Sequence, residues 1–414
     1  MCARVEISAH FCARDGFMPR PTNSGGPTTP VLPQPPWDQR RRRALATLQP
    51  VSDFAAELGQ LAVRLELDLT ADGGPANPLV VLELDRWRDA PPEYVSRAAD
   101  LVATALPVTA GVLAGPPTAS LEPLITAATL TLAARDFRHV AIISADDIPG
   151  GIPGAPGLAP DLAGAVARLR AAIGHSPRAA IACGQLVRQT AVLPATAGLT
   201  AEATVYSLLL GGAEFARWLA ERGAPRHRQP PAEPVRIIRD GGHLSIVLND
   251  PRRRNAFSAG LREALLDAVL LAEADETIES VELTGAGPAF CSGGDLDEFG
   301  TAKDFVAACL VRLSRAPWRV IDRIAPKVTV VAHGACVGAG TELTAYAGRV
   351  VATPDAFFAL PEVRMGLVPG AGGSVSVVRR VGRWRAAWLM LTGERLPATT
   401  ALRWGLVDEI RPPR

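Results

Sequence analysis

Apolar positions in the first half of the chain form short runs that alternate with longer amphipathic segments. Clusters of β-branched and aliphatic residues predict strands at residues 78–87, 107–115 and 139–145. Apolar positions spaced by three or four residues predict helices at 91–106, 121–134 and 199–223. Because strand and helix alternate along the chain, this pattern is typical of an α/β domain.

The second half repeats this alternation. Its β-rich runs predict strands at 243–249, 280–285, 328–334 and 350–354. Helical patterns follow at 261–274 and 341–346, and residues 384–407 read as helical cover with Trp384, Trp388 and Trp404 in the core. The turns that join such units are where α/β proteins carry functional residues.

Proline and charge mark the expected boundaries. Residues 1–50 are rich in Pro, Gly, Thr and Arg, which predicts a disordered tail whose run from Arg40 to Arg43 is solvated. Residues 51–223 are expected to form an α/β domain and residues 235–414 a second one. The segment at 224–234 is rich in proline and charge, so it is expected to be a linker.

Composition narrows the classes of partner. The chain has 414 residues, with 43 Lys and Arg against 42 Asp and Glu, so no global charge recruits nucleic acid or a membrane surface. Its six cysteines lack paired spacing, which argues against a zinc site and a disulfide scaffold. The first residues lack a secretory apolar core, and no run of about eighteen apolar residues follows. We expect a cytoplasmic protein in a reducing compartment.

Two glycine-rich turns precede helix starts, and two acids lie close to such turns. Gly338 to Gly340 come directly before a helical run that begins near Glu342, and Gly293 and Gly294 lie in the segment FCSGGDLDEFG at 290–300. Small residues at a turn expose backbone N–H groups, and one N–H fixed beside a developing oxyanion is worth about 3 kcal/mol of barrier. Glu362 follows Pro361 and precedes an apolar run, so paired carboxylates could manage proton transfer beside such donors.

Four segments of the second half, in order, match a known family. Residues 235–410 resemble the enoyl-CoA hydratase/isomerase (crotonase) superfamily through LNDPRRRNAFS (248–258), FCSGGDL (290–296), HGACVGAGTEL (333–343) and LPEVRMGLVPGAGG (360–373). The resemblance implies a spiral of ββα units in this half. It also implies a CoA thioester as substrate, with no further cofactor and no metal.

The resemblance also implies roles for single residues. The positions of Gly294 and Ala339 donate the two N–H groups that hold the thioester oxygen. Glu342 and Glu362 occupy the positions of the two glutamates that flank the attacking water in hydratases of the family. Substrate and CoA contacts carry over to Asn255, Ala256, Phe257, Arg254, Gly293, Gly338 and Gly370.

Both glutamates are present, which favours reversible addition of water to a 2-enoyl-CoA thioester. Isomerisation, thioester hydrolysis and cofactor-free dioxygenation of an arylacetyl-CoA remain alternatives within the superfamily. A non-catalytic acyl-CoA-binding or scaffold protein is the alternative of another class.

The two ends of the matched region leave further questions open. The resemblance implies a further C-terminal helical segment, which in the family covers the acyl site and builds the trimer, whereas this chain stops at Arg414. Helices at 199–223 could supply that cover, with Leu208, Leu209, Leu210, Phe215 and Trp218 facing a groove; otherwise the site is open.

Residues 51–223 read either as a degenerate crotonase-like half or as an unrelated α/β domain. A homo-oligomer is also compatible with the sequence.

Overall fold

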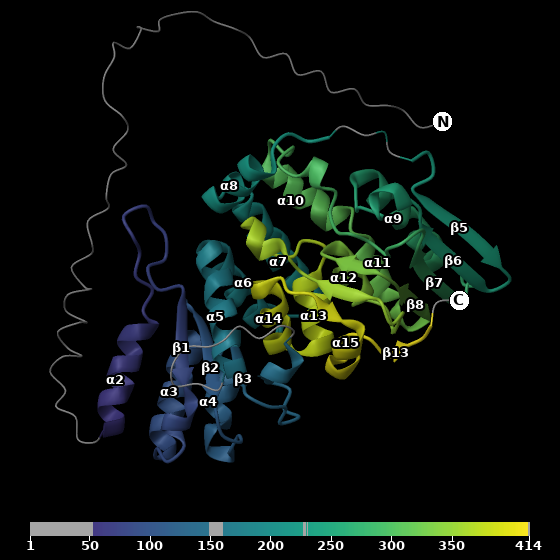
Figure 1. The fold of residues 1–414 in the computed structure, drawn as a ribbon. Helices are drawn as coiled ribbons and strands as arrows, with labels where there is room; N and C mark the ends of the chain where they lie inside the picture. The colour runs from purple at the N-terminus through teal and green to yellow at the C-terminus, as the bar shows by residue number, and fades with distance from the viewer. Residues whose placement is uncertain (1–52, 149–159, 227–228, 230, 413–414) are drawn as a thin grey trace, which may run out of the picture. The chain divides into compact units, whose positions relative to one another are not determined.

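The structure is a computed structural model that describes residues 53–148, 160–226, 229 and 231–412 (Figure 1). These residues belong to one compact unit, Gln49–Arg414, in which helices and strands alternate. The α/β class predicted from the sequence is confirmed. The tail at 1–50 and part of the expected linker lie outside the described residues. Within the described ranges, no helix has both the length and the apolar character needed to cross a bilayer.

A four-stranded parallel sheet forms the centre of the first half. Its strands run in the order β1 (Leu79–Glu83), β2 (Val108–Leu113), β3 (Leu130–Ala133) and β4 (Ile142–Ser144). Strands β2 to β4 are buried throughout, because helices cover both faces of the sheet. One face packs on α2 (Asp53–Leu65), α3 (Pro92–Thr104) and α4 (Glu122–Ala127). The other face packs on α5 (Pro160–His175), α6 (Pro177–Thr190) and α14 (Arg383–Thr392).

Two helices differ from the sequence prediction. The helix expected at 121–134 ends at Ala127, because the following residues form β3, where the β-branched Thr131 fits a buried pleat. The helix expected at 199–223 is divided into α7 (Ala195–Leu209) and α8 (Ala213–Arg222), with Gly211 and Gly212 between them. Leu208, which was expected to face a groove, is 76% exposed, so that expectation was wrong.

The second half contains two sheets. The larger has six strands in the order β13 (Glu409–Ile410), β10 (Arg349–Ala352), β8 (Val328–Ala332), β7 (Ser280–Gly285), β6 (His243–Leu248) and β5 (Val235–Asp240). All its neighbours are parallel except the β5–β6 hairpin. The smaller sheet has the order β12 (Leu396–Pro397), β11 (Phe357–Ala359) and β9 (Ala335–Val337). The helices of this half are α9 (Ala259–Ala274), α10 (Phe305–Ser314), α11 (Pro317–Arg323), α12 (Ala339–Thr344), α13 (Gly373–Val381), α14 and α15 (Ala398–Trp404).

Helices of the first half lie directly on helices of the second. Helix α7 contacts α10 and α13, while α6 contacts α13 and α14, as Figure 1 shows near its centre. One hydrophobic core runs from β2 and β3 through these helices to β6, β7 and β8. The surroundings of α12 and α13 are therefore built from both halves.

Candidate active site

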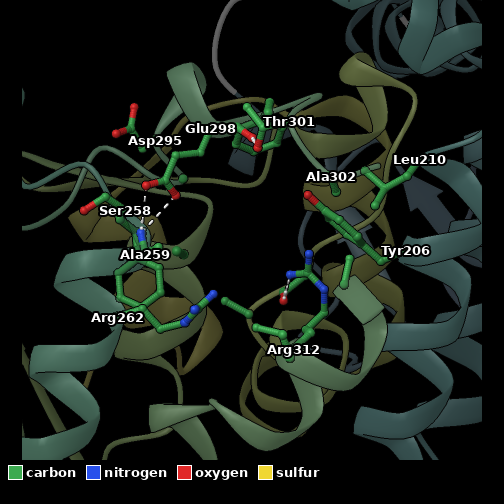
Figure 2. Close-up of a pocket in the computed structure, with 18 of the residues that line it drawn as sticks. Tyr206, Leu210, Ser258, Ala259, Arg262, Asp295, Glu298, Thr301, Ala302 and Arg312 are labelled. Carbon is green, nitrogen blue, oxygen red and sulfur yellow. Dashed lines mark hydrogen bonds between the residues drawn. The ribbon is translucent and has the colours of Figure 1, made fainter. Parts of the chain in front are cut away.

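A cavity of about 520 Å³ lies between helices of both halves. Tyr206 and Leu210 reach its wall from the end of α7, Arg262 from α9 and Arg312 from α10 (Figure 2). The predicted site residues in its wall are Phe257, Gly294, Ala339, Glu342, Glu362 and Gly370. Six residues that the sequence analysis singled out thus share one cavity.

The two glycine-rich turns lie side by side at this cavity. The Cys291 N–H donates to the Ala335 carbonyl at 3.1 Å, and the Val337 N–H donates to the Cys291 carbonyl at 3.0 Å. Gly293 has φ of +95°, and a Cβ there would meet the Val337 carbonyl oxygen at 2.9 Å, so the close approach requires glycine. Among the described residues, no acceptor takes the N–H of Gly294 or Ala339. Two backbone donors from two loops therefore remain available at one cavity.

Glu342 lies in the first turn of α12 and is 2% exposed. Its Oε2 accepts the N–H of Ala371 at 2.7 Å and that of Gly373 at 2.8 Å. Burial raises the pKa of Glu342 to about 7, although these two donors and the positive charge of Arg312 oppose the rise. The carboxyl is thus poised to titrate close to neutral pH.

Glu362 begins the 3₁₀ turn η7 (Glu362–Met365) and is 8% exposed. Its Oε2 is buried without a hydrogen-bond partner among the described residues. Burial, followed by the charge of Glu342, raises the pKa of Glu362 well above that of an ordinary glutamate. One carboxyl of the pair is therefore held by backbone donors, whereas the other favours its protonated form.

The carboxyl of Glu202 is also buried close to this pair, and sequence reasoning missed it. Glu202 comes from α7, is 2% exposed, and accepts the N–H of Gly372 at 2.7 Å and that of Ser374 at 2.8 Å. The sequence carries one signal for it, since an acid at position 202 falls on the same helical face as the buried Leu199 and Tyr206. Helical spacing indicates burial, but it does not identify the partner.

Two other side chains in the cavity wall were also missed. The Arg312 guanidinium stacks on the Tyr206 ring, 3.7 Å from its centroid, and donates to the Gly370 carbonyl at 2.7 Å. Burial raises the pKa of the Tyr206 hydroxyl, and the charge of Arg312 opposes that rise. Helix α10 is amphipathic and carries no sequence motif. In the sequence, Arg312 is a single cation on a helix, and nothing further marks it as a residue of the cavity wall.

The residues assigned to CoA divide into two groups. Phe257 and Gly370 line the cavity, whereas Asn255, Ala256, Arg254, Gly293 and Gly338 are not among the described residues of its wall. Asn255 is fully buried, and its amide donates to the carbonyls of Ala286, Ala289 and Phe290. This side chain fixes the turn that carries Phe257, while Arg254 is exposed. A CoA contact at Asn255, Ala256 and Arg254 remains a prediction.

Cys291 and Cys336, which lie beside the two glycine-rich turns, have surroundings that suppress the reactivity of their thiols. Both are fully buried, and burial raises the pKa of Cys291 to about 12 and that of Cys336 well above its ordinary value. Neither thiol is a nucleophile under such conditions. Within the described ranges, no group of three His, Cys, Asp or Glu side chains is arranged to hold a metal ion.

The second half matches a family model, and several known proteins match the same region. The model described as "Enoyl-CoA hydratase/isomerase" covers residues 239–414. A Thermus thermophilus protein that is named as an enoyl-CoA hydratase is 39% identical over 176 residues. These residues are 42% of this chain and 69% of that protein. The 2,3-dehydroadipyl-CoA hydratase of Escherichia coli is 34% identical over 169 residues, which are 41% of this chain and 66% of that enzyme.

Among solved structures, the enoyl-CoA hydratase of Mycobacterium smegmatis aligns with a TM-score of 0.41 and 32% identity, over 44% of this chain and 71% of that one. The chain spans 60% of the length of a mitochondrial hydratase of Dictyostelium discoideum, at 32% identity. Residues before 239 lie outside the family model. Through its second half, the chain belongs to the enoyl-CoA hydratase/isomerase family.

Proposed function

We propose that this protein catalyses the reversible addition of water to a 2-enoyl-CoA thioester. The observation that carries the proposal is the unequal pair of buried glutamates, Glu342 and Glu362, in the same cavity as two unused backbone N–H groups. Environments that separate the pKa values of two carboxyls assign one as base and the other as acid. Hydration needs both roles, together with donors for the thioester oxygen.

In this mechanism the N–H groups of Gly294 and Ala339 hold the thioester oxygen. Ionised Glu342 takes a proton from water while the water oxygen bonds to C3 and the double-bond electrons move toward the thioester, giving an enolate. Donors placed at the developing oxyanion lower this barrier. Protonated Glu362 then gives its proton to C2, which completes the 3-hydroxyacyl-CoA. Glu342 releases its proton to solvent and Glu362 takes one up before the next turnover, and the reverse steps release water.

Replacing either glutamate by glutamine tests the pair. We expect Glu342→Gln and Glu362→Gln each to lower kcat by about 10²- to 10⁴-fold, because each removes one acid–base group. The assay follows loss of the conjugated double bond over a panel of 2-enoyl-CoA thioesters. Near-normal turnover in either variant would contradict the paired mechanism.

Glu122→Gln is the matched control. Glu122 begins α4 and bonds the His139 ring at 3.0 Å, and its side chain is 47% exposed, whereas Glu342 and Glu362 are buried. We expect wild-type turnover in this variant. Binding of a saturated acyl-CoA, measured by calorimetry, should survive in all three variants.

A further inference from the structure

Four consecutive backbone N–H groups at the start of α13 are shared between two buried carboxyls. The N–H groups of Ala371 and Gly373 donate to Glu342, and those of Gly372 and Ser374 donate to Glu202. Successive amides therefore point alternately to the two acids. One acid belongs to the second half and the other to the first.

Glu202 contacts the loop at 371–374 and does not line the cavity. The Ser374 hydroxyl also donates to its Oε2 at 2.7 Å, so three donors converge on one carboxyl. Glu202 is not among the described residues of the cavity wall, although Tyr206, one helical turn later, is. A carboxyl that is buried and bound by three donors fixes the groups that donate to it.

We propose that Glu202 is a positioning residue for the acid–base pair: by holding Gly372 and Ser374, it aims the Ala371 and Gly373 N–H groups at Glu342. The first half of the chain thus supplies part of the acid–base arrangement, from a residue outside the family match at 239–414. The inference rests on the proposed hydration, in which Glu342 is the base.

Charge adds a second link between the two acids. Burial and then the charge of Glu342 raise the pKa of Glu202 to about 8, while Ser374 and Gly372 oppose the rise. The other titratable and charged groups that face the two acids are Glu362 from η7, Arg312 from α10, Tyr206 from α7, Tyr346 after α12, Cys183 from α6 and Cys291. The effect of a substitution at Glu202 should therefore be measured as the pH profile of kcat.

Two variants test whether Glu202 holds the loop. Glu202→Gln keeps the shape but replaces one acceptor oxygen by an NH2 group, so at least one of the three donors loses its acceptor. Glu202→Asp keeps both carboxyl oxygens but falls short of the loop. In both variants Glu342 loses well-aimed donors, so the acidic limb of the kcat profile should move to higher pH. We expect kcat to fall by about 10- to 100-fold in both, with KM within about threefold, since misplacement away from the chemistry acts on the reacting step.

Glu214→Gln is the matched control for burial. Glu214 lies in α8, is buried, and accepts the N–H groups of Arg178 and Ala179 at 2.8 and 2.9 Å. It holds the start of α6 and not the loop at 371–374. This variant should lower the unfolding temperature without moving the pH profile.

A double-mutant cycle on unfolding tests the link without using activity. Wild type, Glu202→Gln, Glu342→Gln and the double variant are compared by thermal unfolding at neutral pH, and we expect the two changes to be non-additive. Absent turnover of every enoyl-CoA by wild type would overturn the hydratase proposal, whereas non-additive unfolding would still support the Glu202–Glu342 link. Additive unfolding, or pH profiles that stay fixed in both Glu202 variants, would overturn the positioning role.

Discussion

Glu342 and Glu362 line one cavity but have different surroundings. Two backbone N–H groups hold Glu342, whereas Glu362 has a buried oxygen with no partner among the described residues. Burial acts on both, so the difference comes from the donors that the loop before α13 places at Glu342 and from the charge of Glu342, which raises the pKa of Glu362 further. The two carboxyls therefore differ in their surroundings and not in residue type, and the proposed mechanism uses Glu342 as base and Glu362 as acid.

The raised pKa of Glu342 has a consequence for stability. Its pKa is about 7 in the folded chain against a reference value of 4.5, so between these values the folded state binds more protons than the unfolded state. The free energy of unfolding should therefore fall as pH rises through this window. Thermal unfolding from pH 4.5 to 7 should show this slope in wild type and a shallower slope in Glu342→Gln; equal slopes would contradict the raised pKa.

Gly338 has φ of +50°, and a Cβ added there would lie 2.5 Å from Glu362 Oε1. We expect Gly338→Ala to displace Glu362 and to lower kcat at least about tenfold. Gly241 has φ of +55° with open space around it, so Gly241→Ala reports backbone strain alone, about 1 kcal/mol. Equal activity in the two variants would show that Glu362 has room to move.

Sequence reasoning singled out those residues of the candidate site that sit within local motifs. Gly294, Ala339, Glu342 and Glu362 lie on turns whose glycines and following helix starts can be read directly, and the structure gathers them at one cavity. Glu202, Tyr206 and Arg312 could not be found this way. Their positions depend on packing of α7 and α10 against elements far along the chain, and no local pattern encodes that packing.

At the scale of elements, strands were easier to predict than helix ends. The run at 280–285 is β7 as predicted, because its apolar alternation is strong and bounded. The helices expected at 121–134 and 199–223 were too long, since the buried position of β3 and the two glycines after α7 override helical spacing. Helix α7 matters most, because it carries both Glu202 and Tyr206 to the site.

The close contact of α7 with α13 depends on Gly198. A Cβ at this position would lie 2.9 Å from Val375 Cγ2, whereas Gly59 in α2 has open space around it. Gly59→Ala should therefore stabilise the fold by about 0.5–1 kcal/mol through helix propensity alone. Gly198→Ala should lack this stabilisation or lower the free energy of unfolding. It should also lower kcat, because it shifts Glu202. Equal stabilisation of both variants, measured by urea unfolding, would argue against tight α7–α13 packing.

At the scale of the whole molecule, the two halves share structure. The hydrophobic core that contains β2 and β3 also contains β6, β7 and β8. Arg383, at the start of α14, donates to the carbonyls of Ala128 and Thr126 in the first half. The first half is therefore part of the surroundings of the site.

A shared core predicts cooperative unfolding. We expect calorimetry and near-ultraviolet circular dichroism to report one coincident transition for residues 53–412. Two separated transitions would mean that each half is stable alone, and that the contacts of α6 and α7 with α13 and α14 contribute little.

The proposed reaction adds water across a 2-enoyl-CoA double bond. The most direct measurement is mass spectrometry of the product formed from a 2-enoyl-CoA thioester in ¹⁸O-labelled water. The mechanism predicts a 3-hydroxyacyl-CoA that carries one labelled oxygen, with the thioester intact. A product of unchanged mass, free CoA with a labelled acid, or oxygen derived from O₂ would contradict hydration.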